Sequence, residues 1–281
     1  MKKIAILGTE NSHAWGFASL LAKGTYPDIR LVGYYGDETG NTAIRSSAGF
    51  DCVMSDYNDL VGKVDGVMVT ARHGANHLKY ALEYIKTGIP VWLDKPLTAS
   101  VGDTRELGEL LAKYKNPFCG GSMLGLVDDT LAARDFVKNP EGSVCGGAVS
   151  APVNMVNPYG NFWFYTAHLA QIMLTTFGDN VKSVIARKNN KGVSAIYCYD
   201  DFDVTAAFGA DYSVSVYTDK TVFHRHISLD NGTERELAEF HDILTGGDNP
   251  HTFAALSRHV FVIDATIRAF ESGKETAVDS L

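Results

Sequence analysis

The stretch Val91-Trp92-Leu93-Asp94-Lys95-Pro96 indicates how the first half of the chain folds. Three apolar residues are typical of a short buried strand, and the proline has no N–H, so the strand cannot continue as a paired ladder. In open α/β sheets, ligands bind at the carboxyl ends of the strands. Lys95 is therefore expected at the rim of a cleft, where it could bridge a cofactor and a substrate, or donate a proton if its pKa is lowered. Taken alone, a lysine after a strand is more often a solvated surface residue.

Strands and helices alternate around this stretch for about 120 residues, which predicts a doubly wound parallel sheet of the Rossmann type. Hydrophobic runs predict strands at 4–8, 29–35, 64–70, 90–93 and 118–121. Helical spacing and stop signals predict helices at 14–22, 78–85 and 101–114, with Ser100 as an N-cap, and a short helix that closes at 60–62.

The first turn from strand to helix is Gly8-Thr9-Glu10-Asn11-Ser12-His13. A dinucleotide fingerprint would read G-x-G-x-x-G here, and only its first glycine is present. Glu10 stands where the middle glycine would let the backbone approach a pyrophosphate, and a carboxylate 4 Å from a phosphate is repelled by about 1 kcal/mol in water. The helix N-terminus and the Ser12 hydroxyl could still hold a phosphate.

Other polar residues follow the carboxyl ends of neighbouring predicted strands. Asp37 comes just after the strand at 29–35 and is placed to accept a hydrogen bond from a ribose hydroxyl, although a simple turn residue is an equally good interpretation. Arg72 and His73 follow the strand at 64–70, and His77 lies at the first turn of the next helix. These three are better candidates for the cofactor cleft than for a metal site.

With these elements placed, the chain resembles the Gfo/Idh/MocA family of NAD(P)-dependent oxidoreductases over most of its length. The likeness is sharpest from Val64 to Leu97, where the Glu-Lys-Pro motif of the family stands as Asp94-Lys95-Pro96. In the family this lysine contacts the substrate and the nicotinamide, which implies the same role for Lys95. The resemblance implies NAD or NADP as the cofactor. The predicted cofactor site consists of Gly8, Glu10, Asn11, Ser12, His13, Asp37, Thr70, Ala71, Arg72, His77, Asp94, Lys95 and Pro96.

A second motif of the family, D-x-G-x-H-x-x-D, corresponds to residues 164–171. His168 matches the histidine of the motif, whereas Phe164, Thr166 and Gln171 replace the first acid, the glycine and the last acid. In the family the histidine and the last acid contact the substrate and often move its proton. Without the resemblance, His168 would more often be a hydrogen-bonded core residue of an apolar helix.

The resemblance therefore assigns the catalytic residues Lys95, His168 and Tyr165, and the substrate contacts Lys95, His168 and Gln171. Histidine titrates near neutral pH, so His168 is the natural general acid/base. Tyr165 could assist as a hydroxyl donor, whereas the amide of Gln171 cannot accept a proton.

The second half of the chain predicts an α+β domain with a mostly antiparallel open sheet. Turn signals separate short strand-like runs, and helices are predicted at 128–138, 162–177 and 253–270. We expect a dinucleotide-binding Rossmann domain at 1–122 and a substrate-binding and oligomerisation domain at 123–281. The resemblance suggests a homodimer or homotetramer. The predicted strands are 145–151, 181–187, 194–199, 204–208, 212–217 and 221–228.

Composition excludes several classes of partner. The formal net charge of −8, with no basic run, argues against nucleic acid, and no apolar stretch is long enough to span a membrane. The four isolated cysteines read as reduced residues of a cytoplasmic protein. The pairs His73/His77 and His224/His226 lack an evident third ligand, so no metal is expected.

Three functions are compatible with these residues. The leading prediction is an NAD(P)-dependent oxidoreductase that moves a hydride to or from a secondary alcohol or carbonyl of a sugar or polyol-like molecule. The departures at Glu10, His13 and Gln171 keep open a non-catalytic nucleotide- or sugar-binding protein. A third alternative is an enzyme with tightly bound NAD that gives net elimination or epimerisation.

Overall fold

The computed structural model describes residues 1–152, 156–189, 192–209 and 211–281. They form two compact units. Unit 1 comprises residues 1–121 and 233–256, and unit 2 comprises residues 122–232 and 257–281.

Unit 1 contains a five-stranded parallel sheet with the strand order β2-β1-β3-β4-β5. The order reverses between β1 and β3, which is the switch point where open α/β sheets bind ligands. This confirms the predicted Rossmann-type fold. The strands are β1 (Lys2–Leu7), β2 (Ile29–Tyr35), β3 (Gly66–Val69), β4 (Val91–Asp94) and β5 (Phe118–Gly121).

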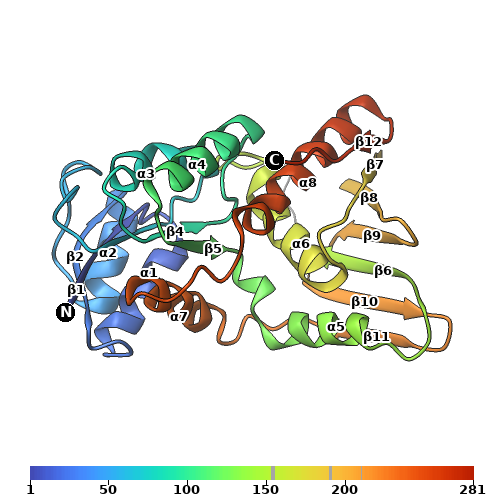
Figure 1. The fold of residues 1–281 in the computed structure, drawn as a ribbon, viewed down its shortest axis with the longest axis horizontal. Helices are drawn as coiled ribbons and strands as arrows, with labels where there is room; N and C mark the ends of the chain where they lie inside the picture. The colour runs from blue at the N-terminus through green and yellow to red at the C-terminus, as the bar shows by residue number, and fades with distance from the viewer. Residues whose placement is uncertain (153–155, 190–191, 210) are drawn as a thin grey trace. The chain divides into compact units, whose positions relative to one another are not determined.

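Helices cover both faces of this sheet (Figure 1). On one face, α1 (Ser12–Ala22) and α7 (Gly232–Leu244) share a core with the strands, in which Phe17, Trp92 and Phe240 are fully buried. On the other face, α3 (His77–Ile85) packs on β3 and β4 beside α4 (Val101–Tyr114). Ser100 caps α4 as predicted, since its hydroxyl accepts from the Asp103 N–H at 3.0 Å.

One expectation about these elements is wrong, and one helix was not predicted. The helix before β3 is α2 (Glu38–Ala48), which packs beside α1, and residues 60–62 form turns instead of closing a helix. The helix α7 was not predicted, although Leu237, Phe240 and Leu244 follow the Asp230-Asn231-Gly232 turn signal at helical spacing.

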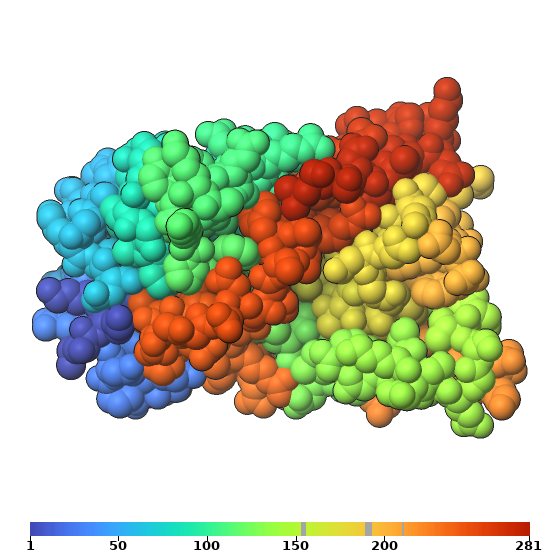
Figure 2. Space-filling model, in the orientation of Figure 1, coloured from blue at the N-terminus to red at the C-terminus, as the bar shows by residue number. Residues whose placement is uncertain are grey.

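The compact units also differ from the expected domains. The division at Gly121/Ser122 lies next to the predicted boundary, but residues 233–256 pack with unit 1 and not with the second half of the chain. Figure 2 shows this segment, in orange, lying against the blue and green parts of unit 1. The apolar face of α7 joins the Rossmann core, and this contact cannot be seen in linear order.

Unit 2 contains a seven-stranded sheet with the order β11-β10-β6-β9-β8-β7-β12. The β6–β9 pair is parallel and the other pairs are antiparallel, so the predicted mostly antiparallel α+β fold is confirmed. The strands are β6 (Val144–Ala151), β7 (Ser183–Asn189), β8 (Gly192–Cys198), β9 (Asp203–Phe208), β10 (Ser213–Thr218), β11 (Val222–His226) and β12 (Thr276–Ala277).

Helices α5 (Asp128–Lys138), α6 (Phe162–Phe177) and α8 (Phe253–Ser272) pack with this sheet, and a short 3-10 turn at Met123–Gly125 lies next to α6. A second 3-10 turn, at Gly74–Asn76, lies in unit 1 directly before α3. The bounds of α6 are those predicted from its apolar run. Across the described ranges, no helix combines the length and the apolar character needed to cross a membrane.

Candidate active site

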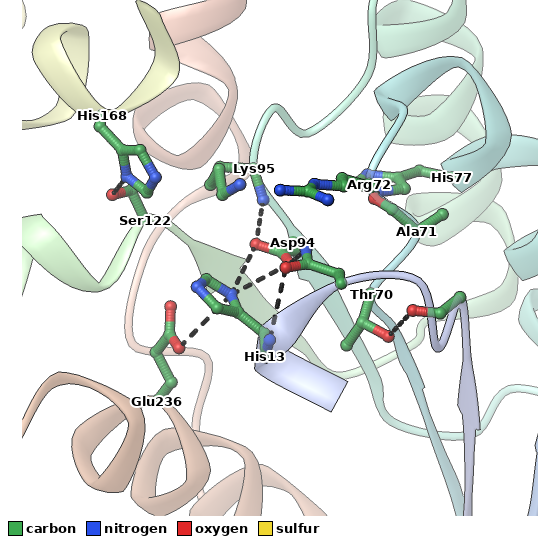
Figure 3. A network of polar contacts seen from close by, with 12 residues as sticks. His13, Thr70, Ala71, Arg72, His77, Asp94, Lys95, Ser122, His168 and Glu236 are labelled. Atoms are coloured by element: carbon green, nitrogen blue, oxygen red, sulfur yellow. Dashed lines mark hydrogen bonds and ion pairs between the residues drawn. The ribbon is translucent and has the colours of Figure 1, made fainter. Parts of the chain in front are cut away.

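The carboxyl end of β4 holds a buried polar network around Asp94 (Figure 3). Asp94 has no exposed surface, and its carboxylate accepts hydrogen bonds from Asn11 Nδ2 and from the backbone N–H of Lys95, each at 2.6 Å. His13 Nδ1 lies 3.0 Å from the same carboxylate. The parallel sheet brings the loop after β1 to the end of β4 although β3 runs between the two strands.

His13 occupies the position where the dinucleotide fingerprint has its third glycine, and it is only 6% exposed. Its ring meets the edge of Phe17 and lies between two carboxylates, with Glu236 Oε2 at 4.0 Å. Burial lowers the pKa of His13, but the charges of Asp94 and Glu236 outweigh it, so the pKa is raised and the imidazolium is favoured. Burial opposes the ionised form of Asp94 as well, but His13 and Lys95 bring the pKa of this carboxyl below its ordinary value.

Lys95 is buried and only 3% exposed, so its interpretation as a solvated surface lysine is wrong. Burial lowers the pKa of its ammonium, and the charges of Asp94 and Glu236 offset part of this effect. An ammonium with a lowered pKa can release a proton more readily than a surface lysine. The end of β4 therefore presents a lysine suited to hold an oxygen atom and to exchange its proton.

Glu236, on α7, is a member of this network that the sequence did not indicate. It is 1% exposed, and neither carboxylate oxygen has a hydrogen-bond partner among the described residues. Burial is the main reason that its pKa rises to about 8. The spacing of apolar residues could have revealed the helix, but no sequence signal points from Glu236 to His13, which lies far away in the chain.

The loop after β1 is tied to the loop after β3. Gly8 has a φ of 103°, and a Cβ at this position would lie 2.2 Å from the backbone nitrogen of Ala71, so glycine is required by close backbone packing. Glu10 Oε1 accepts from the backbone N–H of Arg72 at 3.0 Å. Asn11 caps α1 by accepting from the His13 N–H at 3.3 Å, and Ser12 is exposed at the start of that helix.

Asp37 is exposed at the carboxyl end of β2 and caps α2, since its Oδ1 accepts from the Gly40 N–H at 2.7 Å. Asp37 is therefore the N-cap of a helix, and its interpretation as a simple turn residue is wrong. A carboxylate has capacity for further hydrogen bonds, so this contact is compatible with the predicted contact to a ribose.

Four predicted cofactor residues lie deeper than expected. Thr70, Ala71 and His77 have no exposed surface, and Pro96 is also buried. His77 Nε2 lies 2.7 Å from the Ala71 carbonyl and His77 Nδ1 lies 3.1 Å from the Leu97 carbonyl. His77 therefore joins the loops that follow β3 and β4, and we now expect it to position these loops instead of touching a ligand.

In unit 2, His168 is 6% exposed on α6, and its Nδ1 lies 2.7 Å from the hydroxyl of Ser122 (Figure 3). Tyr165 lies one turn earlier, with its ring 6.1 Å from the His168 ring. Gln171 lies one turn later and donates from Nε2 to Thr175 Oγ1 at 3.2 Å. Ser122 was not predicted, because a serine 46 positions before the histidine carries no sequence signal of this contact.

Comparisons with known proteins identify the first segment of the chain. Residues 2–121 match the model of the Gfo/Idh/MocA family, which is described as an oxidoreductase family with an NAD-binding Rossmann fold. This segment belongs to the Gfo/Idh/MocA family. The predicted cofactor, NAD or NADP, is confirmed at the level of this family. A comparison with curated proteins found no significant match.

Solved structures resemble the whole chain, at sequence identities that show the fold alone. Myo-inositol 2-dehydrogenase from Lactobacillus plantarum has a TM-score of 0.84 at 14% identity, and 99% of each chain is covered. Scyllo-inositol dehydrogenase from Lactobacillus casei, with bound NAD(H) and scyllo-inositol, has a TM-score of 0.82 at 16% identity, with 99% of each chain covered. An NAD binding oxidoreductase from Klebsiella pneumoniae has a TM-score of 0.75 at 15% identity and covers 100% of this chain and 99% of its own.

The Gfo/Idh/MocA segment retains groups that fit a dinucleotide. The N-terminus of α1 and the exposed Ser12 hydroxyl suit a phosphate, and the exposed carboxylate of Asp37 suits a ribose hydroxyl. Glu10 would repel a pyrophosphate, and the hydrogen bond that its carboxylate accepts from the Arg72 N–H offsets part of this repulsion. Within the described part of the chain, no group of three or more His, Cys, Asp or Glu side chains is arranged to hold a metal ion.

Proposed function

We propose that the protein is an NAD(P)-dependent oxidoreductase that transfers a hydride to or from a secondary alcohol or carbonyl of a sugar or polyol-like small molecule. The observation that carries this proposal is the buried Lys95 directly after β4, in a segment of an NAD-binding oxidoreductase family. Inositol dehydrogenases share the fold, which supports a polyol-like substrate.

Lys95 would hold the reacting oxygen of the substrate through Nζ. Bound NAD(P) would accept or supply the hydride. The carboxylate of Asp94 keeps a negative charge beside the ammonium, and its own hydrogen bonds to Asn11 and His13 fix its position. The chain thus supplies orientation and charge at the reacting oxygen.

His168 would exchange the proton of the substrate hydroxyl. Only the neutral tautomer that carries its proton on Nδ1, and donates it to Ser122 Oγ, leaves Nε2 as a proton acceptor. Tyr165, one turn away on α6, would add a hydroxyl donor, and Gln171 would contact a substrate hydroxyl without accepting its proton.

The test is a fluorescence titration with NADH and with NADPH. Trp15 follows the loop after β1 and donates from its indole N–H to the Thr9 carbonyl at 2.6 Å, so its emission should change when a dinucleotide binds. A Trp15→Phe variant, with the remaining tryptophans intact, identifies the source of the signal. The proposal would be refuted if neither cofactor binds at about 1 mM. A Kd of that size corresponds to a binding free energy of about −4 kcal/mol.

Two alternatives to this proposal stay open, and the first has an observation in its favour. Gln171 in place of an acid favours a non-catalytic nucleotide- or sugar-binding protein, because an amide cannot act as a base. An enzyme with tightly held NAD that gives net elimination or epimerisation would retain cofactor through purification. Cofactor binding without turnover on a panel of polyols supports the first alternative, and cofactor that copurifies with the protein supports the second.

A further inference from the structure

Helix α7 carries two carboxylates that the proposed reaction does not use. Glu236 and Glu239 are three residues apart and so lie on the same face of the helix. Both oxygens of Glu236 and Oε2 of Glu239 are buried without a hydrogen-bond partner among the described residues. Burying an ionised carboxylate in this way is costly, so both groups hold a proton more tightly than an exposed carboxyl does.

The inner end of this pair reaches the network at β4. Glu236 Oε2 lies 4.0 Å from His13 Nδ1, and His13 in turn contacts Asp94 at 3.0 Å. Figure 3 shows the Glu236 side chain directed toward the ring of His13. The charge of Lys95 acts on His13, Asp94 and Glu236.

The outer end of the pair reaches solvent. Glu239 Oε1 lies 3.7 Å from His251 Nε2, and the side chain of His251 is 40% exposed. His13, Glu236, Glu239 and His251 therefore follow one another from the buried end of β4 to the surface of unit 1. Each of the four side chains can take up and release a proton.

We infer that Glu236 and Glu239 form a proton path between the Asp94–His13 pair beside Lys95 and solvent at His251. The inference rests on the proposed function, because oxidation of an alcohol by hydride transfer releases one proton per turnover and the reverse reaction consumes one. This route stands beside the proton exchange proposed for His168 and uses the fraction of Lys95 that is a neutral amine. In it, the substrate hydroxyl gives its proton to that amine, and the resulting ammonium reprotonates His13 after His13 has passed its proton to the Glu236 carboxylate. Glu236 protonates Glu239, Glu239 protonates His251, and His251 releases the proton to water. Every carrier returns to its starting charge.

The protonation equilibria of both carboxyls suit this transfer. Burial raises the pKa of Glu236 to about 8 and that of Glu239 to about 7, so each group exchanges protons near neutral pH. The charged groups that act on Glu236 are His13 from α1, Asp94 and Lys95 from the end of β4, and Glu239 from its own helix. Glu239 faces His251 from the segment after α7 and acts on the buried thiol of Cys119 in β5.

The first test uses the protein without cofactor. Infrared difference spectra between about pH 5 and about pH 10 should show two buried carboxylic acids that ionise. Glu236→Gln should remove one band and Glu239→Gln the other. The matched control is Glu234→Gln, which changes an exposed carboxylate of the same helix and should leave both bands. The inference is wrong if both buried variants keep both bands.

The second test measures transfer. In dilute buffer, Glu239→Gln should lower kcat roughly 10-fold or more, and rising concentrations of a small buffer such as imidazole should restore it. Glu234→Gln should match the wild type at every buffer concentration. A kcat of Glu239→Gln that equals the wild-type value in dilute buffer would overturn the path. Failure of the proposed function would appear separately, as absent NADH and NADPH binding, while the infrared bands would still report on the two carboxyls.

Discussion

At the scale of single residues, burial changes what a lysine can do. A solvated lysine keeps its ammonium at neutral pH, whereas burial of Lys95 moves its pKa downward despite the nearby Asp94 and Glu236. The same burial means that removing Lys95 affects packing as well as charge. Tests of its role must therefore keep its volume.

Lys95→Met should keep the fold and lower kcat roughly 100-fold or more, because the variant fills the space without holding or protonating the reacting oxygen. Circular dichroism checks the fold, and steady-state kinetics on the true substrate measure kcat. Near-normal kcat in Lys95→Met would remove this lysine from the mechanism.

A second prediction concerns the tautomer of His168. Ser122→Ala removes the partner of His168 Nδ1 and should lower kcat about 10-fold while changing KM little. In concentrated buffer, where proton transfer along α7 does not limit turnover, the wild-type rate should fall at low pH through a single histidine-like transition. His168→Asn should abolish this fall in rate together with most of the activity. A wild-type rate that stays flat from about pH 5 to about pH 8 would contradict the role of His168.

At the scale of elements, the loop after β1 shows how a lost fingerprint can be compensated. The carboxylate of Glu10 accepts a hydrogen bond from the backbone N–H of Arg72, so it stabilises the loop while adding a negative charge near the predicted phosphate site. A change to glycine would remove both effects together. A change to glutamine separates them, because the amide oxygen still accepts a hydrogen bond.

Glu10→Gln should tighten NADH binding by about 1 kcal/mol at most, which is roughly a five-fold lower Kd. The effect should shrink as salt is added, because the loop is partly exposed. The exposed Glu106→Gln on α4 serves as the control for loss of one negative charge. Unchanged affinity in Glu10→Gln would mean that phosphates do not bind near this carboxylate.

Helix α7 should make stability depend on pH. The pKa of Glu236 is about 8 in the folded protein against an ordinary 4.5, so its contribution to stability is full below about pH 4.5 and is lost as pH rises through about 8. Glu239 and His13 act in the same direction, whereas Asp94, whose pKa is lowered, stays ionised across this window.

Glu236→Gln should therefore lose less stability than the wild type between about pH 5 and about pH 8, because the variant lacks this titrating carboxyl. One group can change the slope of the free energy of unfolding against pH by at most about 1.4 kcal/mol per pH unit. Chemical denaturation at several pH values measures this difference. Parallel curves for the wild type and Glu236→Gln would show that this carboxyl does not hold its proton in the folded state.

At the scale of the whole molecule, the proposed catalytic groups come from different units. Lys95 belongs to unit 1 and His168 to unit 2. The proposed function gives each of them a part in the same turnover. Residues that act as one catalytic group lose activity non-additively when they are changed together.

The double variant Lys95→Met/His168→Asn should accordingly be no slower, within about three-fold, than the slower of its two single variants. Single-turnover rates of the wild type, the two single variants and the double variant give the coupling free energy between the two residues. Strictly multiplicative losses would indicate that the two residues act at independent sites.

The sequence by itself determined the architecture of each unit. The strands of the Rossmann sheet, helix α4 with its Ser100 cap, and the bounds of α6 follow from apolar periodicity and from capping residues, which are local signals. The placement of Lys95 at the end of β4 followed from the same local signals. Helix α7 was detectable in principle, because its apolar spacing is also local.

Only the tertiary structure decided the surroundings of Lys95. His13 and Asp94 are 81 positions apart, and the sheet order joins them across an intervening strand. Glu236 reaches them because residues 233–256 return to unit 1 after the chain has built most of unit 2. Charge pairing and burial depend on distances between atoms and not on separation along the chain, so no local pattern could show that His13, Asp94 and Glu236 share one buried network.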